Sequence, residues 1–153
     1  MKPYWINVSA AAAFALTPVA AHSQDQYAVG GTFVMENAKT EEGCIGFVDV
    51  LSAAEGSGWS SAGWAWNLAQ GEAPQSVVLV GSDDTVIALA QIDEERPDVA
   101  QAILEVTSDR VGWSVTGEGE PPSHDEVTAY ALLDNETVCL PPLQIAKQDS
   151  NPG

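Results

Sequence analysis

The feature that most constrains this chain is a succession of short apolar runs, each ended by a turn-forming residue. The runs are between four and nine residues long, rich in β-branched and aromatic side chains, and bounded by Gly, Pro, Asn, Asp and Ser. Such runs favour strands, and many short strands separated by turns are typical of all-β domains. The expected strands cover residues 32–36, 44–51, 58–66, 76–81, 85–92, 110–116, 126–133 and 137–140.

One segment departs from this pattern. Its apolar residues recur at the spacing of one helical face, at Val99, Ala102, Ile103 and Val106. Pro97 suits the first position of a helix. We therefore expect one short helix near residues 97–106, lying across an edge or an open end of the strands. Together these elements predict an all-β fold, a two-sheet antiparallel β-sandwich that is immunoglobulin-like or jelly-roll-like.

The first 23 residues have the organisation of a secretory signal peptide. Lys2 gives a positive start, residues 6–16 are mostly apolar and uncharged, and small side chains precede a cleavage site. Cleavage after Ser23 is favoured, and cleavage after Ala21 is the alternative. A bilayer-spanning helix needs about 20 apolar residues, so this run is too short. We expect export to the periplasm or the extracellular space without a membrane span after cleavage; a retained anchor is the other interpretation.

The rest of the chain is expected to fall into three parts. Residues 24–43 form an N-terminal segment with the first edge strand, and residues 44–140 form the β-sandwich domain. Residues 141–153 are polar and end in Asn-Pro-Gly, which predicts a disordered tail.

The charge of the chain is strongly one-sided, with 22 Asp and Glu against five Lys and Arg and a formal net charge of −17. Nucleic acid is excluded as a partner, because no basic surface is available to replace the counterions of phosphates. The same sign opposes adhesion to an anionic membrane. The acidic clusters at 41–42, 83–84, 93–95 and 118–126 are interpreted as solvated turns. Bound calcium is the alternative, although no EF-hand spacing is present.

Cys44 and Cys139 are the two cysteines of the chain. In an oxidising compartment such a pair predicts one disulfide. Its loop of about 95 residues would stabilise the fold by about 4–5 kcal/mol in the chain-entropy model. A metal-binding pair or a nucleophilic cysteine is the alternative, but neither has the histidine partners that such sites use.

No motif in the sequence indicates an enzyme. Ser123, His124 and Asp125 are sequence neighbours, whereas the fold normally brings the residues of a catalytic triad together. No G-x-S-x-G elbow is present. A pair of carboxylates acting as a hydrolase is the distant enzymatic alternative. We expect no catalytic residue, no metal and no cofactor.

Several short motifs follow one another along the chain. They are Gly46-Phe47-Val48-Asp49, Gly63-Trp64-Ala65-Trp66-Asn67, the valine-rich residues 77–80, Arg96-Pro97-Asp98-Val99 and Gly112-Trp113. The succession resembles a β-sandwich module of the bacterial cell envelope that is often attached to glycosyltransferases. The resemblance covers roughly residues 44–139 and implies a sandwich fold, while no function is established for the module. It implies a structural motif made of Gly63, Trp64, Arg96, Pro97, Asp98, Gly112 and Trp113.

The tryptophans are the residues with most potential for ligand binding. In a strand Trp64 and Trp66 share one face, and Trp59 lies on the other. Trp64 and Trp113 are interpreted as core residues. Trp59 and Trp66 are tentative ligand-binding residues, whose rings could stack on a sugar, and an equal alternative places them in the core.

These observations together predict an exported, non-catalytic accessory protein of the bacterial periplasm or cell envelope. It would act by contact with a protein partner. The alternative is a carbohydrate-binding module that binds a glycan through exposed tryptophans.

The processing of the chain can be tested by intact-mass measurement on protein purified from its native envelope fraction. We expect the mass of a chain that begins at Gln24, reduced by two hydrogens because the cysteines are paired. A mass that retains residues 1–23 would contradict cleavage, and a mass without the loss of two hydrogens would contradict the disulfide.

Overall fold

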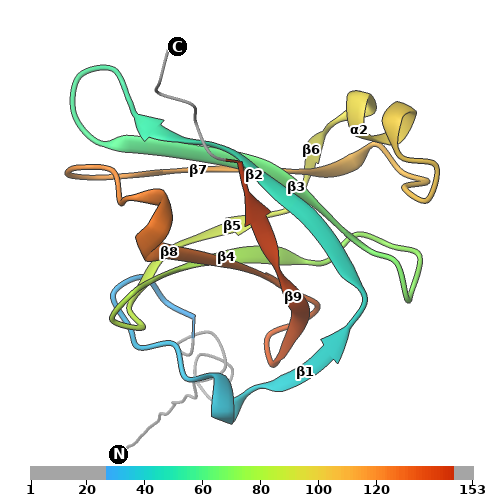
Figure 1. Ribbon diagram of the computed structural model, residues 1–153, viewed down its shortest axis with the longest axis horizontal. Helices are drawn as coiled ribbons and strands as arrows, with labels where there is room; N and C mark the ends of the chain where they lie inside the picture. Colours follow the sequence, from blue (N-terminus) through green and yellow to red (C-terminus); the bar gives the residue numbers. More distant parts are fainter. Residues whose placement is uncertain (1–26, 147–153) are drawn as a thin grey trace, which may run out of the picture.

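The computed structural model describes residues 27–146 (Figure 1). The predicted signal peptide, residues 1–23, lies outside the described residues, as does the end of the predicted tail, residues 147–153. Among the residues described, no helix is both long and apolar enough to cross a membrane.

Strands dominate the described chain, which confirms the all-β prediction. The elements in chain order are η1 (Met35–Asn37), β1 (Lys39–Glu42), β2 (Cys44–Ala53), β3 (Trp59–Asn67), β4 (Ser76–Gly81), β5 (Val86–Gln91), β6 (Glu94–Glu95), α2 (Pro97–Ala102), β7 (Arg110–Gly117), η2 (His124–Glu126), β8 (Val127–Leu132) and β9 (Thr137–Ile145).

Seven of the eight expected strands form, and they are β2 to β5 and β7 to β9. The prediction of a strand at residues 32–36 is wrong, because Thr32 makes only an isolated bridge to Thr85 and a 3₁₀ turn follows. The sequence pattern missed β1 and β6. Their residues are charged or polar and exposed, so they lack the apolar alternation that indicates a strand and owe their conformation to pairing.

The strands form one curled, mixed sheet rather than two antiparallel sheets. Their hydrogen-bonded order is β5-β4-β8-β9-β2-β3-β7-β6, with β1 on β9. The β9 strand runs parallel to both β1 and β2, so the purely antiparallel sandwich is not confirmed. Only Ile92 and Asp93 separate β5 from β6, and β6 pairs with β7. The chain itself therefore joins the two ends of the sheet.

Strand β9 changes its parallel partner along its length. Its first half pairs with β1, and Gln144 and Ile145 pair with β2. Between these halves the Gly43 N–H donates to the carbonyl of Leu140 at 2.9 Å. Residues 141–145 are therefore strand, and the prediction that they belong to a disordered tail is wrong. The segment was expected to be disordered because it is polar, but its Leu143 is buried in the core.

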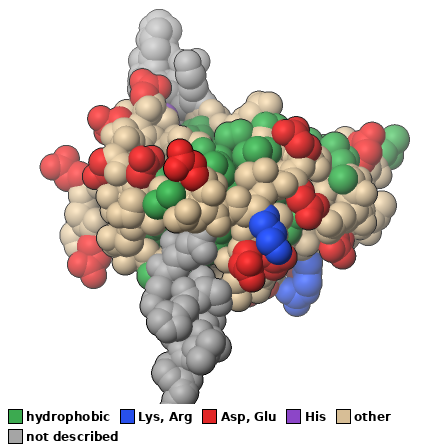
Figure 2. All heavy atoms as spheres, turned by 90° about the horizontal axis from the view of Figure 1, so that it is seen from below, with side chains coloured by type: hydrophobic (Ala, Val, Ile, Leu, Met, Phe, Trp, Pro, Cys, Tyr) green, Lys and Arg blue, Asp and Glu red, His purple; other side chains and the backbone are tan. Residues whose placement is uncertain are grey.

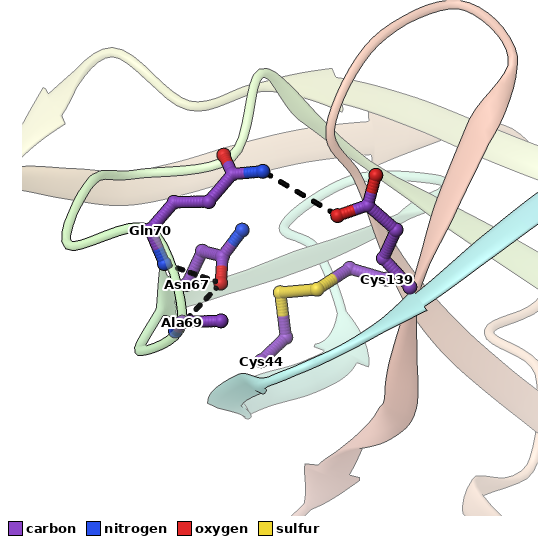
Figure 3. The surroundings of a disulfide bond; sticks show 6 residues. Cys44, Asn67, Ala69, Gln70 and Cys139 are labelled. Atoms are coloured by element: carbon purple, nitrogen blue, oxygen red, sulfur yellow. Dashed lines mark hydrogen bonds between the residues drawn. A yellow bond between two sulfur atoms is a disulfide. The ribbon is translucent and has the colours of Figure 1, made fainter.

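The predicted disulfide is present between Cys44 and Cys139, whose Cα atoms lie 5.8 Å apart (Figure 3). It links the start of β2 to β9 at the corner where β9 changes partner. Both cysteines are buried. Beside them the turn after β3 is held by Asn67, whose side-chain oxygen accepts hydrogen bonds from the N–H groups of Ala69 and Gln70 (Figure 3).

The apolar side chains form an inner core and two outer layers. The inner core takes alternate residues from β2 to β5 and β7 to β9, including Trp59 and Trp113. One outer layer packs Tyr27 and Phe33, from the segment before β1, on residues of β4, β5, β8 and β9. The other packs α2 and the residues after it on β3 and β7. The helix ends at Ala102, earlier than expected, and its Val99 packs with Trp64 and Trp66 of β3.

The loop closed by the disulfide predicts its contribution to stability. We expect the Cys44→Ala/Cys139→Ala double variant to lose about 4–5 kcal/mol of unfolding free energy. Urea unfolding of the oxidised protein and of the variant measures the difference in unfolding free energy. Alanine is chosen instead of serine, because serine would bury two hydroxyl groups. Adding reductant should lower the unfolding free energy of the wild type and leave that of the variant unchanged. A loss below about 1 kcal/mol would show that the loop entropy is not what stabilises this fold.

Candidate functional site

All four tryptophans of the described chain are packed inside the protein. Trp64 and Trp113 are core residues, as expected. Trp59 is 3% exposed and Trp66 is 2% exposed. Stacking on a sugar needs an accessible ring face, so the expectation that these two rings stack on a sugar is wrong. The expected alternation holds, since Trp64 and Trp66 share an outer layer and Trp59 lies in the inner core.

Two glycines of the structural motif are needed for close packing. A side chain at Gly63 would collide with the carbonyl oxygen of Phe47 on β2 and would lie 2.9 Å from the ring of Trp113. A side chain at Gly112 would lie 2.6 Å from Cγ of Arg96. Larger residues at these positions would therefore separate β2 from β3 or displace Arg96.

Arg96 connects two separate motifs of the sequence through its side-chain hydrogen bonds. Its Nη1 donates to Oδ2 of Asp49 at 3.0 Å, and its Nε and Nη2 donate to the two carboxylate oxygens of Asp98 at 2.9 and 2.8 Å. Asp49 is the extra residue of a β-bulge between Val48 and Val50, and such bulges re-aim side chains. Pro97 starts α2 between the paired residues.

The charges in this cluster compensate one another. The hydrogen bonds from Arg96 lower the pKa of the Asp98 carboxyl, and the bonds to Asp98 and Asp49 raise the pKa of the Arg96 guanidinium. Two carboxylates therefore neutralise one guanidinium, which leaves no free positive charge to bind an anion. The cluster clamps the start of α2 against β2 and β7 and has a structural role.

Acid–base catalysis receives no support from the described carboxyl groups. A general acid working near neutral pH needs a raised pKa. The shifted carboxyl pKa values are those of Asp83, Asp98 and Asp134, and hydrogen bonds lower all three. Within residues 27–146, no three His, Cys, Asp or Glu side chains gather as a metal site requires.

The neighbouring residues Ser123, His124 and Asp125 form a local turn. The Ser123 hydroxyl accepts a hydrogen bond from the N–H of Asp125 and caps η2. His124 lies within this turn rather than between a nucleophile and an acid. The arrangement therefore has the geometry of a helix cap.

The feature best suited to binding is an apolar groove between β5 and β7. In Figure 1, β5 lies between β7 and β4, and it pairs with β4 while lying close to β7 without strand pairing. The groove has a volume of about 460 Å³. Its lining residues are Val29, Trp59, Ile87, Ala88, Leu89, Val115, Thr116, Gly117 and Glu118. Val29 is 65% exposed at this groove.

The surroundings of the groove are acidic. Glu118 lines it, and the neighbouring hollow, which shares Ile87, carries Asp83 and Glu126. Among the described residues the bases are Lys39, Arg96 and Arg110, of which both arginines already donate hydrogen bonds. Figure 2 shows one face of the molecule, where acidic side chains surround apolar ones and basic side chains are few.

No sequence motif marks this groove. Its residues come from the N-terminal segment, β3, β5, β7 and the residue after β7, and the curl of the sheet brings them together. Alternating apolar residues in β5 and β7 indicate strands, but not that two of their edges face each other. Val29 and Glu118 are the lining residues that lie outside the strands.

Comparisons with known proteins found no match to this chain among family models, curated proteins or solved structures. The resemblance to the bacterial envelope module stays a prediction from the motifs. Within the fold, Asp49, Arg96, Asp98 and Gly112 from these motifs lie together.

The Arg96 cluster predicts a pH-dependent loss of stability. We expect Arg96→Met to reduce the unfolding free energy at pH 7 by about 1 kcal/mol or less, because the pair is partly exposed. The pKa of Asp98 is lowered in the folded state, so its stabilising effect is present above its unfolded pKa and disappears as the carboxyl is protonated. The difference from wild type, measured by urea unfolding, should therefore shrink below about pH 4.

Arg110→Met is the matched control for this prediction. Arg110 donates to the backbone carbonyl of Asp93, which does not titrate. Both variants remove one positive charge, so the change in net charge is the same. A pH dependence equal in the two variants would contradict the specific pairing with Asp98.

Proposed function

We propose that this chain is an exported, non-catalytic protein of the bacterial periplasm or cell envelope that acts by binding another protein. The observation that carries the proposal is the apolar groove between β5 and β7, with the exposed Val29 at it. The occupant we propose is an extended segment of a partner protein that carries apolar side chains beside Lys or Arg.

The lining of the groove favours an apolar occupant. Thr116 and Glu118 are the polar side chains among its lining residues. A sugar would leave most of its hydroxyl groups without hydrogen-bond partners there, and unpaired polar groups are costly to bury. A protein segment instead buries apolar side chains, which is favourable. Its backbone could also pair with an open strand edge, as extended peptides do on other sheets.

Charge complementarity supports basic residues in the partner segment. Glu118 lines the groove, and Asp83 and Glu126 lie in the adjoining hollow. With a formal net charge of −17, the chain repels acidic partners and speeds encounter with basic ones. The binding should therefore weaken as ionic strength rises.

The alternative functions have less support. The carbohydrate-binding module relied on exposed rings of Trp59 or Trp66, and both are buried. The carboxylate-based hydrolase needs an acid with a raised pKa, and the shifted pKa values among the described carboxyl groups are lowered.

The test is the size of the native assembly in the envelope fraction, measured by gel filtration with mass analysis in mild detergent. We expect the wild type to elute in an assembly larger than a single chain. Val29→Lys places a positive charge at the groove and should weaken the assembly by about tenfold or more, as loss of a central contact does. The added charge should also repel the basic segment.

Leu104→Lys is the matched control, because Leu104 is 88% exposed and does not line the groove. It should leave the assembly unchanged. Elution of the wild type as a single chain would overturn the proposed function. An equal effect of both variants would show that the contact lies elsewhere.

A further inference from the structure

The groove between β5 and β7 borders a strand edge that has no partner strand along most of its length in the described chain. One edge of β7 pairs with β3 from Gly112 to Gly117. The other edge pairs with β6 at Arg110 and Gly112. Residues 113–117 are therefore paired on one side only among the strands described, and three of them line the groove.

The hydrogen bonds around β7 show which of its backbone groups point to this open edge. The carbonyl of Gly112 accepts from the N–H of Asp93 at 3.1 Å, so Gly112 points away from β3. In an antiparallel pair, consecutive residues point their N–H and C=O groups alternately toward and away from the partner strand, and the β3–β7 register has no bulge. The N–H and C=O groups of Ser114 and Thr116 therefore point away from β3. Both residues are exposed, which leaves this part of the edge open to a second chain.

The groove also opens onto the inner core. Trp59 and Ala88 are buried members of this core, and both line the groove. Ile87 and Val115 also line it and pack against the same core, but they remain partly exposed. An apolar side chain placed in the groove would remove their remaining surface from water, which is favourable.

The outer side of the same edge is acidic. The Ser114 hydroxyl donates to the Glu94 carboxylate, which places this carboxylate beside the edge, and Glu118 lines the groove. Successive side chains of a strand point to opposite faces, and Val115 packs against the inner core while its neighbour Ser114 faces outward. A strand added beside β7 would therefore alternate between inward positions at the core and outward positions near the acidic side chains.

We propose that the partner segment binds as an added β-strand along the open edge of β7, paired with the backbone of Ser114 and Thr116. Its apolar side chains face the inner core through the groove, and Lys or Arg at alternate positions face Glu94 and Glu118. This inference rests on the proposed function, because it specifies how the partner of that function binds. The strand β1 is a poorer acceptor, since all its residues are exposed and three of the four are charged, and charged side chains protect strand edges.

Hydrogen exchange of single amides, measured by mass spectrometry with electron-transfer fragmentation, tests this pairing. The native assembly from the envelope fraction is compared with the same chain after separation from its partner. We expect the N–H groups of Ser114 and Thr116 to exchange at least about tenfold more slowly in the assembly. The N–H groups of Trp113 and Val115 point to β3 and should exchange slowly in both states. The N–H of Thr40 on β1 should exchange at the same rate in both.

Thr116→Pro tests the pairing by mutation. It removes an N–H that would donate to the added strand and, because that N–H points away from β3, it breaks no hydrogen bond of the sheet. Proline is tolerated on edge strands. We expect this variant to weaken the assembly about fivefold to tenfold, the effect of one hydrogen bond. Thr116→Val keeps the N–H and the shape of the side chain, and it should leave the assembly unchanged.

Thr40→Pro is the matched control on the edge of β1. The N–H of Lys39 donates to the carbonyl of Glu136 and so points to β9. The N–H of Thr40, the next residue, therefore points away from β9. Its loss should leave the assembly unchanged, because the partner strand is proposed to lie on β7.

Three results would overturn this inference while the proposed function stands. They are an assembly in which the exchange of Ser114 and Thr116 is not slowed, equal weakening by Thr116→Pro and Thr40→Pro, and weakening by Thr116→Val as large as that by Thr116→Pro. If Thr116→Pro does not fold, the exchange measurement on the wild type decides. Elution of the wild type as a single chain would instead overturn the proposed function, and this inference with it.

Discussion

The corner at which β9 changes its parallel partner is the constraint on which the rest of the structure depends. One strand has to leave β1 and join β2 while keeping β8 on its other side. The buried disulfide between Cys44 and Cys139 spans this corner, and the Gly43 to Leu140 hydrogen bond lies beside it. The corner thereby holds together β1, β2, β8 and β9, which come from the two ends of the described chain.

The curl explains why the four tryptophans of the described residues are buried. A sheet curled this far has an inner face and an outer face, and both are covered here. Trp59 and Trp113 fill the inside, while Trp64 and Trp66 support α2 on the outside. With the large rings used in this way, the surfaces available for binding are those where the covering layers or the strand edges leave cavities.

The scarcity of positive charge shapes both the fold and its surface. Arg96 is one of the few bases, and by pairing with Asp49 and Asp98 it joins β2 to the start of α2. The remaining carboxylates face solvent with little compensation, so copies of the chain repel one another and a basic partner is attracted. A cavity at Tyr27 has no charged side chain among its lining residues.

Local patterns in the sequence determined much of this protein. Alternating β-branched runs specified seven strands, apolar spacing specified a helix at Pro97, and two cysteines specified one disulfide, because each of these signals lies within a few residues or in an unambiguous pair. The tertiary structure alone decided the rest. Parallel pairing of β9, the strand conformation of residues 141–145, the burial of Trp59 and Trp66, and the groove between β5 and β7 depend on contacts between distant segments. Such contacts leave no local periodicity in the sequence, so only the curled sheet shows which edges and side chains come together.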